Sequence, residues 1–235
     1  MSNDYFEFKQ FRIEQNRCAM KVTTDACILG AYTSAPEQGK ILDIGTGTGL
    51  LSLMLAQRTS GVIDAIENDE LSFLQAKENI SKSRWSNRIQ VIHADVKDFD
   101  ARKKYDFIIC NPPFFENHLH SPSAEKNQAR HDVSLDYTTL LNSVSRLLCE
   151  NGSLAVLLPY DQSQNFVRIA HSKGLHLQRQ LLIRNRPDKS FIRIIMIFAS
   201  SPVPKTEIEV LSIKKECGEY SDFFQRLLQD FYLYL

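Results

Sequence analysis

Short apolar runs alternate with longer segments of helical spacing between residue 40 and about residue 175. The runs predict buried strands at 40–45, 62–67, 89–95, 105–111 and 153–159. Apolar residues recur every three to four positions in the intervening segments, which predicts helices at 49–58, 69–83, 135–152 and 164–174. Continuous apolar runs are typical of parallel strands that are buried on both faces. The pattern therefore predicts an α/β fold with a mostly parallel sheet and helices on both faces.

The two ends of the chain depart from this alternation. Residues 5–21 mix aromatic and basic side chains and predict an extended or hairpin arm, and a helix follows at 25–32 with Thr24 or Asp25 near its N-cap. Residues 175–183 and 191–199 predict an antiparallel pair at one sheet edge, followed by a strand at 207–213 and a helix at 221–235. We expect one domain over 1–235, with an arm and helix (1–39), a Rossmann-like core (40–200) and a C-terminal strand and helix (201–235).

Composition limits the function classes. With 43% hydrophobic and 24% charged residues, the chain can bury a full core. Lys and Arg number 28, as do Asp and Glu, so nucleic-acid contact must come from local basic patches. The five cysteines are scattered without CxxC spacing, which favours reduced thiols in a cytoplasm. We see no apolar stretch for a signal peptide or a membrane span, and we expect a cytoplasmic protein.

A glycine-rich turn follows the first predicted strand of the core. The segment LDIGTGTGLL places Gly45, Gly47 and Gly49 between a strand and a helix. Glycines allow a ligand to approach the backbone closely, and the helix N-terminus adds free N–H groups. The dinucleotide fingerprint GxGxxG is broken, because Leu50 stands where its third glycine would be. A generic strand–helix turn is the alternative interpretation.

Acidic residues end the first three strands and make the turn more specific. Asp43 precedes the turn, and Glu67 lies about 20 residues further on, where a carboxylate can bind ribose hydroxyls. Asp95 ends the third strand, where a carboxylate can accept from an adenine amino group. The carboxyl ends of parallel strands meet in one crevice, so the three acids indicate a nucleoside cofactor.

The motif NPPF (111–114) follows the fourth strand. The oxygens of the Asn111 side chain and the Pro112 carbonyl can accept hydrogen bonds from an exocyclic amine, and Pro113 helps to fix the loop. Phe114 can stack on the ring that carries the amine. These four residues are the candidate catalytic group, acting by positioning and electrostatics rather than by a strong base. A rigid strand exit is the structural alternative.

The motifs LDIGTGTG, IDAIEND and IHADV resemble those of the S-adenosylmethionine-dependent methyltransferases with a Rossmann-like fold. The resemblance implies a seven-stranded sheet of order 3-2-1-4-5-7-6, with S-adenosyl-L-methionine as cofactor and S-adenosyl-L-homocysteine as product. It also implies that the glycine turn meets the methionine part, Glu67 the ribose and Asp95 the adenine. In this family, NPP followed by Phe or Tyr marks methylation of planar nitrogens.

The flanking segments narrow the resemblance. FKQF, RCAMKV, LGA, LLSLMLAQR, NPPFF and QAR occur in an order similar to that of the bacterial methyltransferases of the adenosine beside the anticodon (position 37) in a valine tRNA. This implies N6 methylation of adenosine in tRNA, and it implies that Lys21, Thr24 and Asp25 line the cofactor or target pocket. The residues for RNA contact are Arg12 and Arg17 in the arm, Arg130 after the catalytic loop, and Arg184, Arg186 and Lys189 in the loop at 184–190.

Several alternatives stay open. Phe6, Phe8 and Phe11 can stack on unpaired bases or anchor the core, and the basic patches can be solvated surface. The histidines at 118, 120 and 131 lack partners with ligand spacing, so we expect no metal; we also expect a monomer. Other possible substrates are a guanine amino group of rRNA, adenine in DNA, or a protein glutamine. A nucleotide-binding or dehydrogenase-like module is the alternative from another class.

Overall fold

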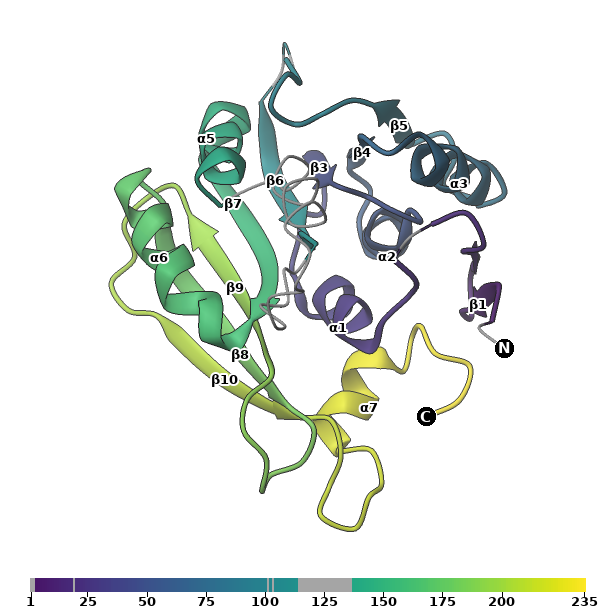
Figure 1. Cartoon of the computed structure of the whole chain (residues 1–235), viewed down its shortest axis with the longest axis vertical. Coiled ribbons are helices and arrows are strands. Elements are labelled where there is room, and N and C mark those ends of the chain that lie inside the picture. Colours follow the sequence, from purple (N-terminus) through teal and green to yellow (C-terminus); the bar gives the residue numbers. More distant parts are fainter. Residues whose placement is uncertain (1–2, 19, 101, 103, 114–136) are drawn as a thin grey trace, which may run out of the picture.

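The computed structural model describes residues 3–18, 20–100, 102, 104–113 and 137–235. In these residues, eight strands form one sheet in the order β10-β8-β9-β7-β6-β3-β4-β5 (Figure 1). Five neighbouring strands run parallel to one another: β3 (Lys40–Ile44), β4 (Val62–Glu67), β5 (Ile89–His93), β6 (Tyr105–Cys110) and β7 (Leu148–Pro159). The expected order 3-2-1-4-5-7-6 is confirmed for the strands from β3 to β9.

The edge of the sheet differs from the expected one by one strand. β8 (His176–Arg184) and β9 (Arg193–Ala199) form the predicted antiparallel pair, and β9 also pairs antiparallel with β7. β10 (Glu207–Ser212) pairs parallel with β8 and adds an eighth strand outside that pair in the described part of the chain. The antiparallel pair therefore lies inside the sheet and not at its edge.

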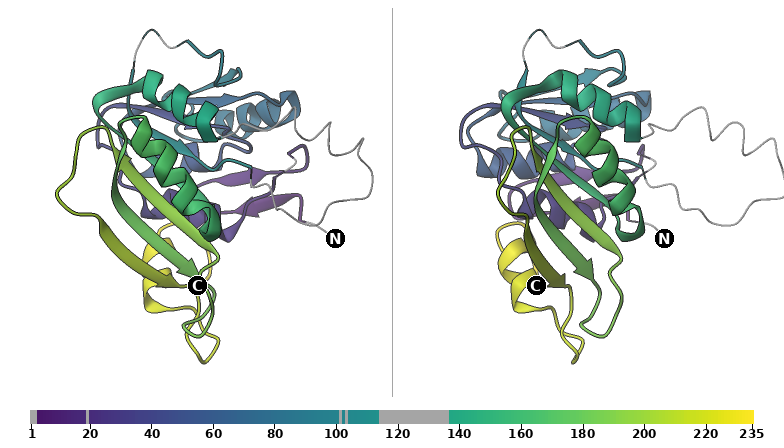
Figure 2. Two further views of the ribbon diagram at one scale, coloured as in Figure 1. Left: turned by 60° about the vertical axis from the view of Figure 1, so that its left-hand side comes forward. Right: turned by 90° about the vertical axis from the view of Figure 1, so that its left-hand side faces the viewer.

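Helices cover both faces of the sheet (Figure 2). One hydrophobic cluster contains residues of α1 (Thr24–Tyr32), α2 (Leu50–Arg58), α3 (Glu70–Ser81) and α7 (Asp222–Leu228). The other contains residues of α5 (Tyr137–Leu147) and α6 (Ser163–Ser172), which follows a short 3-10 turn, η1 (Tyr160–Gln162). Alternate residues of a strand face opposite sides, so Ile41 lies in the first cluster and Leu42 in the second.

Local sequence explains where most helices begin. The side chain of Asp69 accepts a hydrogen bond from the backbone N–H of Ser72, so Asp69 is the N-cap of α3. Thr23 plays this role for α1 by accepting from the N–H of Ala26. Thr24 and Asp25, which were predicted near the N-cap, are the first two residues of α1. α2 is buried almost all round, and Leu50 to Ala56 all lie inside.

Two predicted helices are shorter than their patterns suggested. The segment 135–152 divides into α5 and the start of β7, because Leu148 is buried and pairs with Tyr105 of β6. The last helix ends at Leu228, since Tyr232 turns back to pair with Phe8. In both places, pairing with a distant backbone segment ends a helix that the local sequence would continue.

The N-terminal arm is a hairpin that packs on the C-terminal segment. β1 (Tyr5–Glu7) and β2 (Arg12–Glu14) pair antiparallel, as the hairpin prediction required. Phe8 and Phe11 are 2% and 7% exposed and stack on each other in the core. They are core anchors, and their interpretation as stacking platforms for RNA bases was wrong.

The five cysteines are all free thiols. Of the helices in the described part of the chain, none has both the length and the apolar character that crossing a membrane requires.

Candidate active site

The glycine turn connects β3 to α2 at the carboxyl edge of the sheet. Gly45, Gly47 and Gly49 have φ values of 68°, 57° and 84°, a region that disfavours residues with a Cβ atom. A Cβ atom built on Gly45 or Gly47 would meet no protein atom within 4 Å, so these two positions face open space. A Cβ on Gly49 would come 3.3 Å from Cδ1 of Ile80, so this glycine allows α2 and α3 to pack. The turn thus presents bare backbone to a ligand.

Asp43 is buried directly beneath the turn. Its Oδ2 accepts hydrogen bonds from Oγ1 of Thr46 at 2.6 Å, from Oγ of Ser52 at 2.7 Å and from N of Ser52 at 3.1 Å. Its Oδ1 is buried and has no partner among the described residues. Burial raises the pKa of the Asp43 carboxyl to about 6 against these hydrogen bonds, and the nearby charge of Glu67 raises it further.

Glu67 ends β4 with its carboxylate fixed by backbone donors. Oε1 accepts from the N–H groups of Asn68 and Asp69, both at 3.0 Å, and Oε2 accepts from the N–H of Gly47 at 2.9 Å. A carboxylate has about four acceptor sites. Oε2 therefore keeps acceptor capacity beside the glycine turn, where a ribose hydroxyl can donate.

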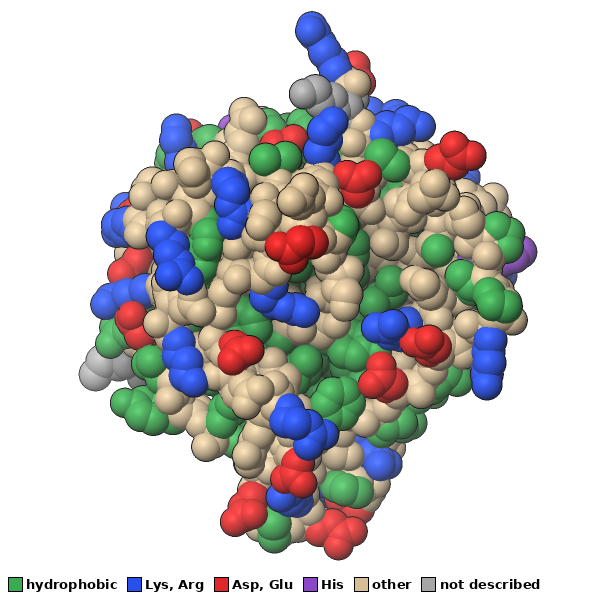
Figure 3. All heavy atoms as spheres, turned by 180° about the vertical axis from the view of Figure 1, so that it is seen from behind, with side chains coloured by type: hydrophobic (Ala, Val, Ile, Leu, Met, Phe, Trp, Pro, Cys, Tyr) green, Lys and Arg blue, Asp and Glu red, His purple; other side chains and the backbone are tan. Residues whose placement is uncertain are grey.

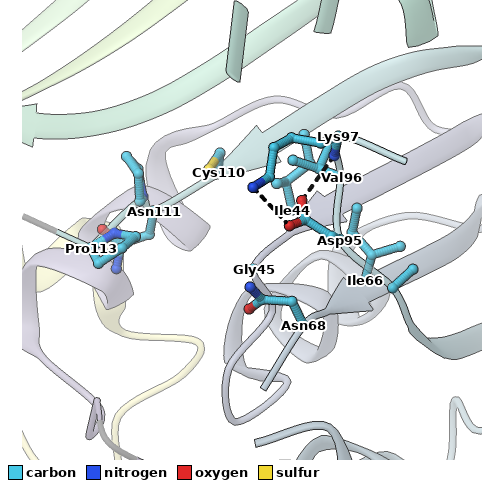
Figure 4. A pocket seen from close by; sticks show the side chains of 12 residues that line it. Ile44, Gly45, Ile66, Asn68, Asp95, Val96, Lys97, Cys110, Asn111 and Pro113 are labelled. Carbon is cyan, nitrogen blue, oxygen red and sulfur yellow. Dashed lines mark hydrogen bonds and ion pairs between the residues drawn. The ribbon is translucent and has the colours of Figure 1, made fainter. Parts of the chain in front are cut away.

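Asp95 follows β5 and lines a cavity of about 200 Å³. Its Oδ1 accepts from the N–H of Lys97 at 2.9 Å, and its Oδ2 lies 3.2 Å from Nζ of Lys97. Figure 4 shows Asp95 and Lys97 across the cavity from Asn111 and Pro113. Ile44, Ile66, Val96 and Cys110 supply apolar walls. A flat apolar ring with an amino group at its edge suits such a slot.

A second cavity, of about 360 Å³, continues from the first. Gly45, Asn68, Asn111 and Pro113 line both, so the two form one crevice along the strand ends. Lys21 lines the second cavity, as the resemblance implied, whereas Thr24 lies in the exposed first turn of α1 and lines neither cavity. Asp25 forms an ion pair with Arg193 of β9, with 3.1 Å between Oδ2 and Nε.

Asn111 occupies the junction of the two cavities. Its Oδ1 is buried and accepts no hydrogen bond from the described residues. Burying an amide oxygen without a donor is unfavourable, so a hydrogen-bond donor from a bound ligand would be favoured at this point. Pro112 and Pro113 follow it and restrict the backbone. Phe114 lies outside the described residues.

β7 and β9 continue the sheet as a wall beside β6, the strand that leads into Asn111. Val156 of β7 pairs with Cys110, the last residue of β6, and β7 continues beyond it to Pro159, which pairs with Arg193. The rings of Tyr160 and Phe191 lie 5.3 Å apart at the top of this wall. In the sequence, Tyr160 is only an aromatic residue directly after one predicted strand, and Phe191 is one at the start of another. The pairing that brings them together could not be read from it.

The basic residues expected to contact RNA are partly paired within the protein. Arg12 lies 2.8 Å from Glu14 and stacks over Tyr5, and Arg17 lies 3.4 Å from Glu78. Arg184, the last residue of β8, donates to Ser212, and Lys189 in the loop between β8 and β9 pairs with Asp188. Arg186 is exposed in the same loop. Arg130 lies outside the described residues.

Charge over the rest of the surface is mixed. Figure 3 shows basic and acidic side chains interspersed over the face opposite to that of Figure 1. In the described ranges, no three His, Cys, Asp or Glu side chains gather as a metal site. The histidines at 118, 120 and 131 lie outside those ranges.

The fold is shared with known methyltransferases. A predicted O-methyltransferase from Agrobacterium tumefaciens matches with a TM-score of 0.68 at 16% identity, covering 88% of this chain and 96% of that one. A methyltransferase from Pyrococcus furiosus matches with a TM-score of 0.61 at 18% identity, covering 82% and 90%. With its glycine turn and strand-end acids, the molecule has the architecture of a Rossmann-like, class I methyltransferase.

Sequence comparison defines the family within this class. The family model of the methyltransferase small domain matches residues 21–158. The tRNA1(Val) (adenine(37)-N6)-methyltransferases of Parabacteroides distasonis and Dyadobacter fermentans are 40% and 43% identical, each covering at least 98% of both chains. The chain therefore belongs to the methyltransferase small domain family and, within it, to the family of these tRNA1(Val) (adenine(37)-N6)-methyltransferases.

Proposed function

We propose that this protein methylates the N6 amino group of adenosine 37 in tRNA1(Val), using S-adenosylmethionine as the methyl donor. The observation that carries the proposal is the buried, unpartnered Oδ1 of Asn111 at the junction of the two cavities. This oxygen can accept a hydrogen bond, and the N–H group of an exocyclic amine can donate one. The names of full-length relatives support adenosine 37 of tRNA1(Val) as the source of that amine.

The cofactor site that we propose is the crevice along the ends of β3, β4 and β5. Gly45 and Gly47 would let the methionine part lie against the backbone, because open space faces both. Glu67 would hold the ribose through its remaining acceptor site, and Asp95 would accept from the adenine amino group. Asp43 lies below with an unpartnered oxygen, which suits a positively charged ligand above it. Lys21 would close the other side.

Methyl transfer to an exocyclic amine does not require a strong general base from the protein. When bound, S-adenosylmethionine supplies an electrophilic methyl group and becomes S-adenosylhomocysteine. The lone pair of an aromatic amine is delocalised into its ring, so the amine attacks poorly. Oδ1 of Asn111 and the Pro112 carbonyl would accept hydrogen bonds from the two N–H groups of the amine and favour a pyramidal nitrogen. The nitrogen becomes cationic on methylation and releases a proton to solvent, so positioning and preorganised acceptors supply most of the rate gain.

The substrate base must leave its stack to reach this junction. We propose that Phe114 stacks on the target ring. Arg184 ends β8, and Arg186 and Lys189 lie in the loop between β8 and β9; all three would contact phosphate groups. Arg12, Arg17 and Arg130 remain proposed contacts as well. For Arg12 and Arg17, binding would require exchange of their ion pairs with Glu14 and Glu78.

We further infer that residues 1–235 act as one catalytic unit, as a monomer in the cytoplasm where tRNA is modified. Residues of the N-terminal hairpin, the core and α7 share one hydrophobic cluster, which supports a single unit.

The test is methyl transfer from labelled S-adenosylmethionine to unmodified total tRNA, with the nucleosides separated by mass spectrometry. The proposal expects label in N6-methyladenosine from one valine tRNA. Label in guanosine of rRNA, in DNA adenine or in a protein glutamine would keep the amine chemistry and reject the substrate. Binding of a nicotinamide dinucleotide in place of S-adenosylmethionine would reject the reaction itself.

A further inference from the structure

The loop after β5 is held differently from the two neighbouring loops of the crevice. The turns after β3 and β4 lead directly into α2 and α3, whose first residues fix them. In the described residues between β5 and β6, no helix follows, yet this loop carries Asp95 and Lys97 to the cavity. Some other contact must therefore fix this side of the crevice.

That contact comes from Arg146 in the last turn of α5. Its Nη1 donates to the carbonyl oxygen of Phe99 at 2.6 Å. Its Nη2 donates to the carbonyl oxygens of Val96 at 3.1 Å and Lys97 at 3.3 Å. The guanidinium thus binds three backbone carbonyls within four consecutive residues. The rigid, planar fork of arginine suits such a task better than the single ammonium of lysine.

Packing and a local turn complete the arrangement. Val96 is buried in the same hydrophobic cluster as Val144 and Leu147 of α5, and Phe99 packs against it. Between these anchors, the N–H of Lys97 donates to Oδ1 of Asp95 and the N–H of Asp98 donates to the carbonyl of Asp95. Fixing the carbonyls of residues 96, 97 and 99 therefore also fixes the direction of the Asp95 carboxylate.

A basic residue near the C-terminus of a helix is often explained by the helix dipole alone. The three hydrogen bonds of Arg146 do not fit that explanation, because all three carbonyls belong to the loop after β5 and none to α5. The side chain joins the helix to the wall of the cavity and not to its own last turn.

We propose that Arg146 is a positioning residue for cofactor binding, which holds Asp95 in the conformation that receives the adenine end. Arg146 itself lines neither of the two cavities. The inference rests on the proposed cofactor site but not on the identity of the RNA. Without Arg146, the loop must be ordered each time a ligand binds, and that ordering weakens binding.

The experiment compares Arg146→Ala, Arg146→Lys and the parent protein, with Arg168→Ala as the matched control. Arg168 is an exposed arginine of α6 that donates to Asn165 of its own helix. Calorimetry with S-adenosylhomocysteine gives affinity, and NMR hydrogen exchange of the unliganded proteins gives the order of the Lys97 and Asp98 amides. We expect about tenfold weaker binding for Arg146→Ala, which corresponds to about 1.4 kcal/mol. Arg146→Lys should recover part of that loss, and Arg168→Ala should bind like the parent.

The exchange data separate positioning from general stability. The Lys97 and Asp98 amides should exchange faster in Arg146→Ala, while the amides of β6 keep the rates of the parent. Unchanged affinity or unchanged exchange at these two amides would overturn the proposal. If Arg146→Ala does not fold, full affinity and slow exchange in Arg146→Lys would overturn it equally. Absence of any S-adenosylhomocysteine binding by the parent would reject the proposed function, whereas the exchange comparison would still test the role of Arg146.

Discussion

Replacing Asp43 by asparagine should change how the stability of the protein depends on pH. The carboxyl is fully buried, one oxygen accepts three hydrogen bonds, and the other has no partner in the described residues. Burial is the largest cause that raises its pKa from 3.8 to about 6. Asparagine has nearly the same shape and can still accept from Thr46 and Ser52, but it does not ionise.

The sign and size of the effect follow from the pKa difference. Between pH 3.8 and about pH 6, the folded protein keeps the Asp43 proton while the unfolded chain loses it. The folded state is therefore favoured below pH 3.8, and this contribution is lost as pH rises through the folded pKa. A difference of about two units corresponds to about 3 kcal/mol. Above about pH 6, Asp43 is ionised in both the folded and the unfolded state, so its effect on the free energy of unfolding no longer changes with pH.

Urea unfolding from pH 3.5 to pH 8 measures this contribution directly. We expect the free energy of unfolding of the parent, minus that of Asp43→Asn, to fall by about 3 kcal/mol between pH 4 and pH 7. Subtraction removes the other titrating groups, which both proteins share. Asp161→Asn controls for loss of a carboxylate at an exposed position. A difference that stays level, or that rises with pH, would refute the reasoning that Asp43 is destabilised by burial.

Three further predictions concern the reaction. Asn111→Ala should lower kcat about 100- to 1,000-fold with cofactor affinity retained, because the lost acceptor acts on the reacting amine. Asn142→Ala, at an exposed position, is the control. A large loss of cofactor affinity in Asn111→Ala would contradict this role. Asp95→Ala should weaken S-adenosylhomocysteine binding about tenfold by calorimetry, and an unchanged affinity would exclude Asp95 from the adenine end. Reversing the charges of Arg184, Arg186 and Lys189 together should weaken tRNA binding and flatten its dependence on salt; if both stay as in the parent, the RNA lies on another surface.

Local signals predicted the core strands and the glycine turn closely. β4 covers the predicted residues 62–67, because a strand buried on both faces needs a continuous apolar run. The glycines from 45 to 49 and the Asp69 cap are equally local, since a turn or a cap depends on a few neighbouring residues. The strand-end acids followed from the topology, and Asp95 does line the cavity.

Features that depend on distant partners could not be read in the same way. Leu148 fits a helix in sequence and joins β7 because Tyr105 pairs with it. Phe8 and Phe11 left two interpretations open, because their ring partners in the core, Tyr232 for Phe8 and Trp85 for Phe11, are far along the chain. Arg146 carries no motif, and only the packing of α5 brings it to the carbonyls after β5. The sequence pattern therefore predicts the strands, the turn and the acidic residues of the site, whereas the residues that hold them in place are identified only by tertiary contacts.

The most direct test of the proposed function uses two transcripts of tRNA1(Val), one unmodified and one with guanosine in place of adenosine 37. Each is incubated with labelled S-adenosylmethionine and with the parent protein or Asn111→Ala, and the nucleosides are identified by mass spectrometry. We expect N6-methyladenosine only in the first transcript, at a rate that falls about 100-fold or more for Asn111→Ala. Equal labelling of both transcripts, or full activity of Asn111→Ala, would contradict it.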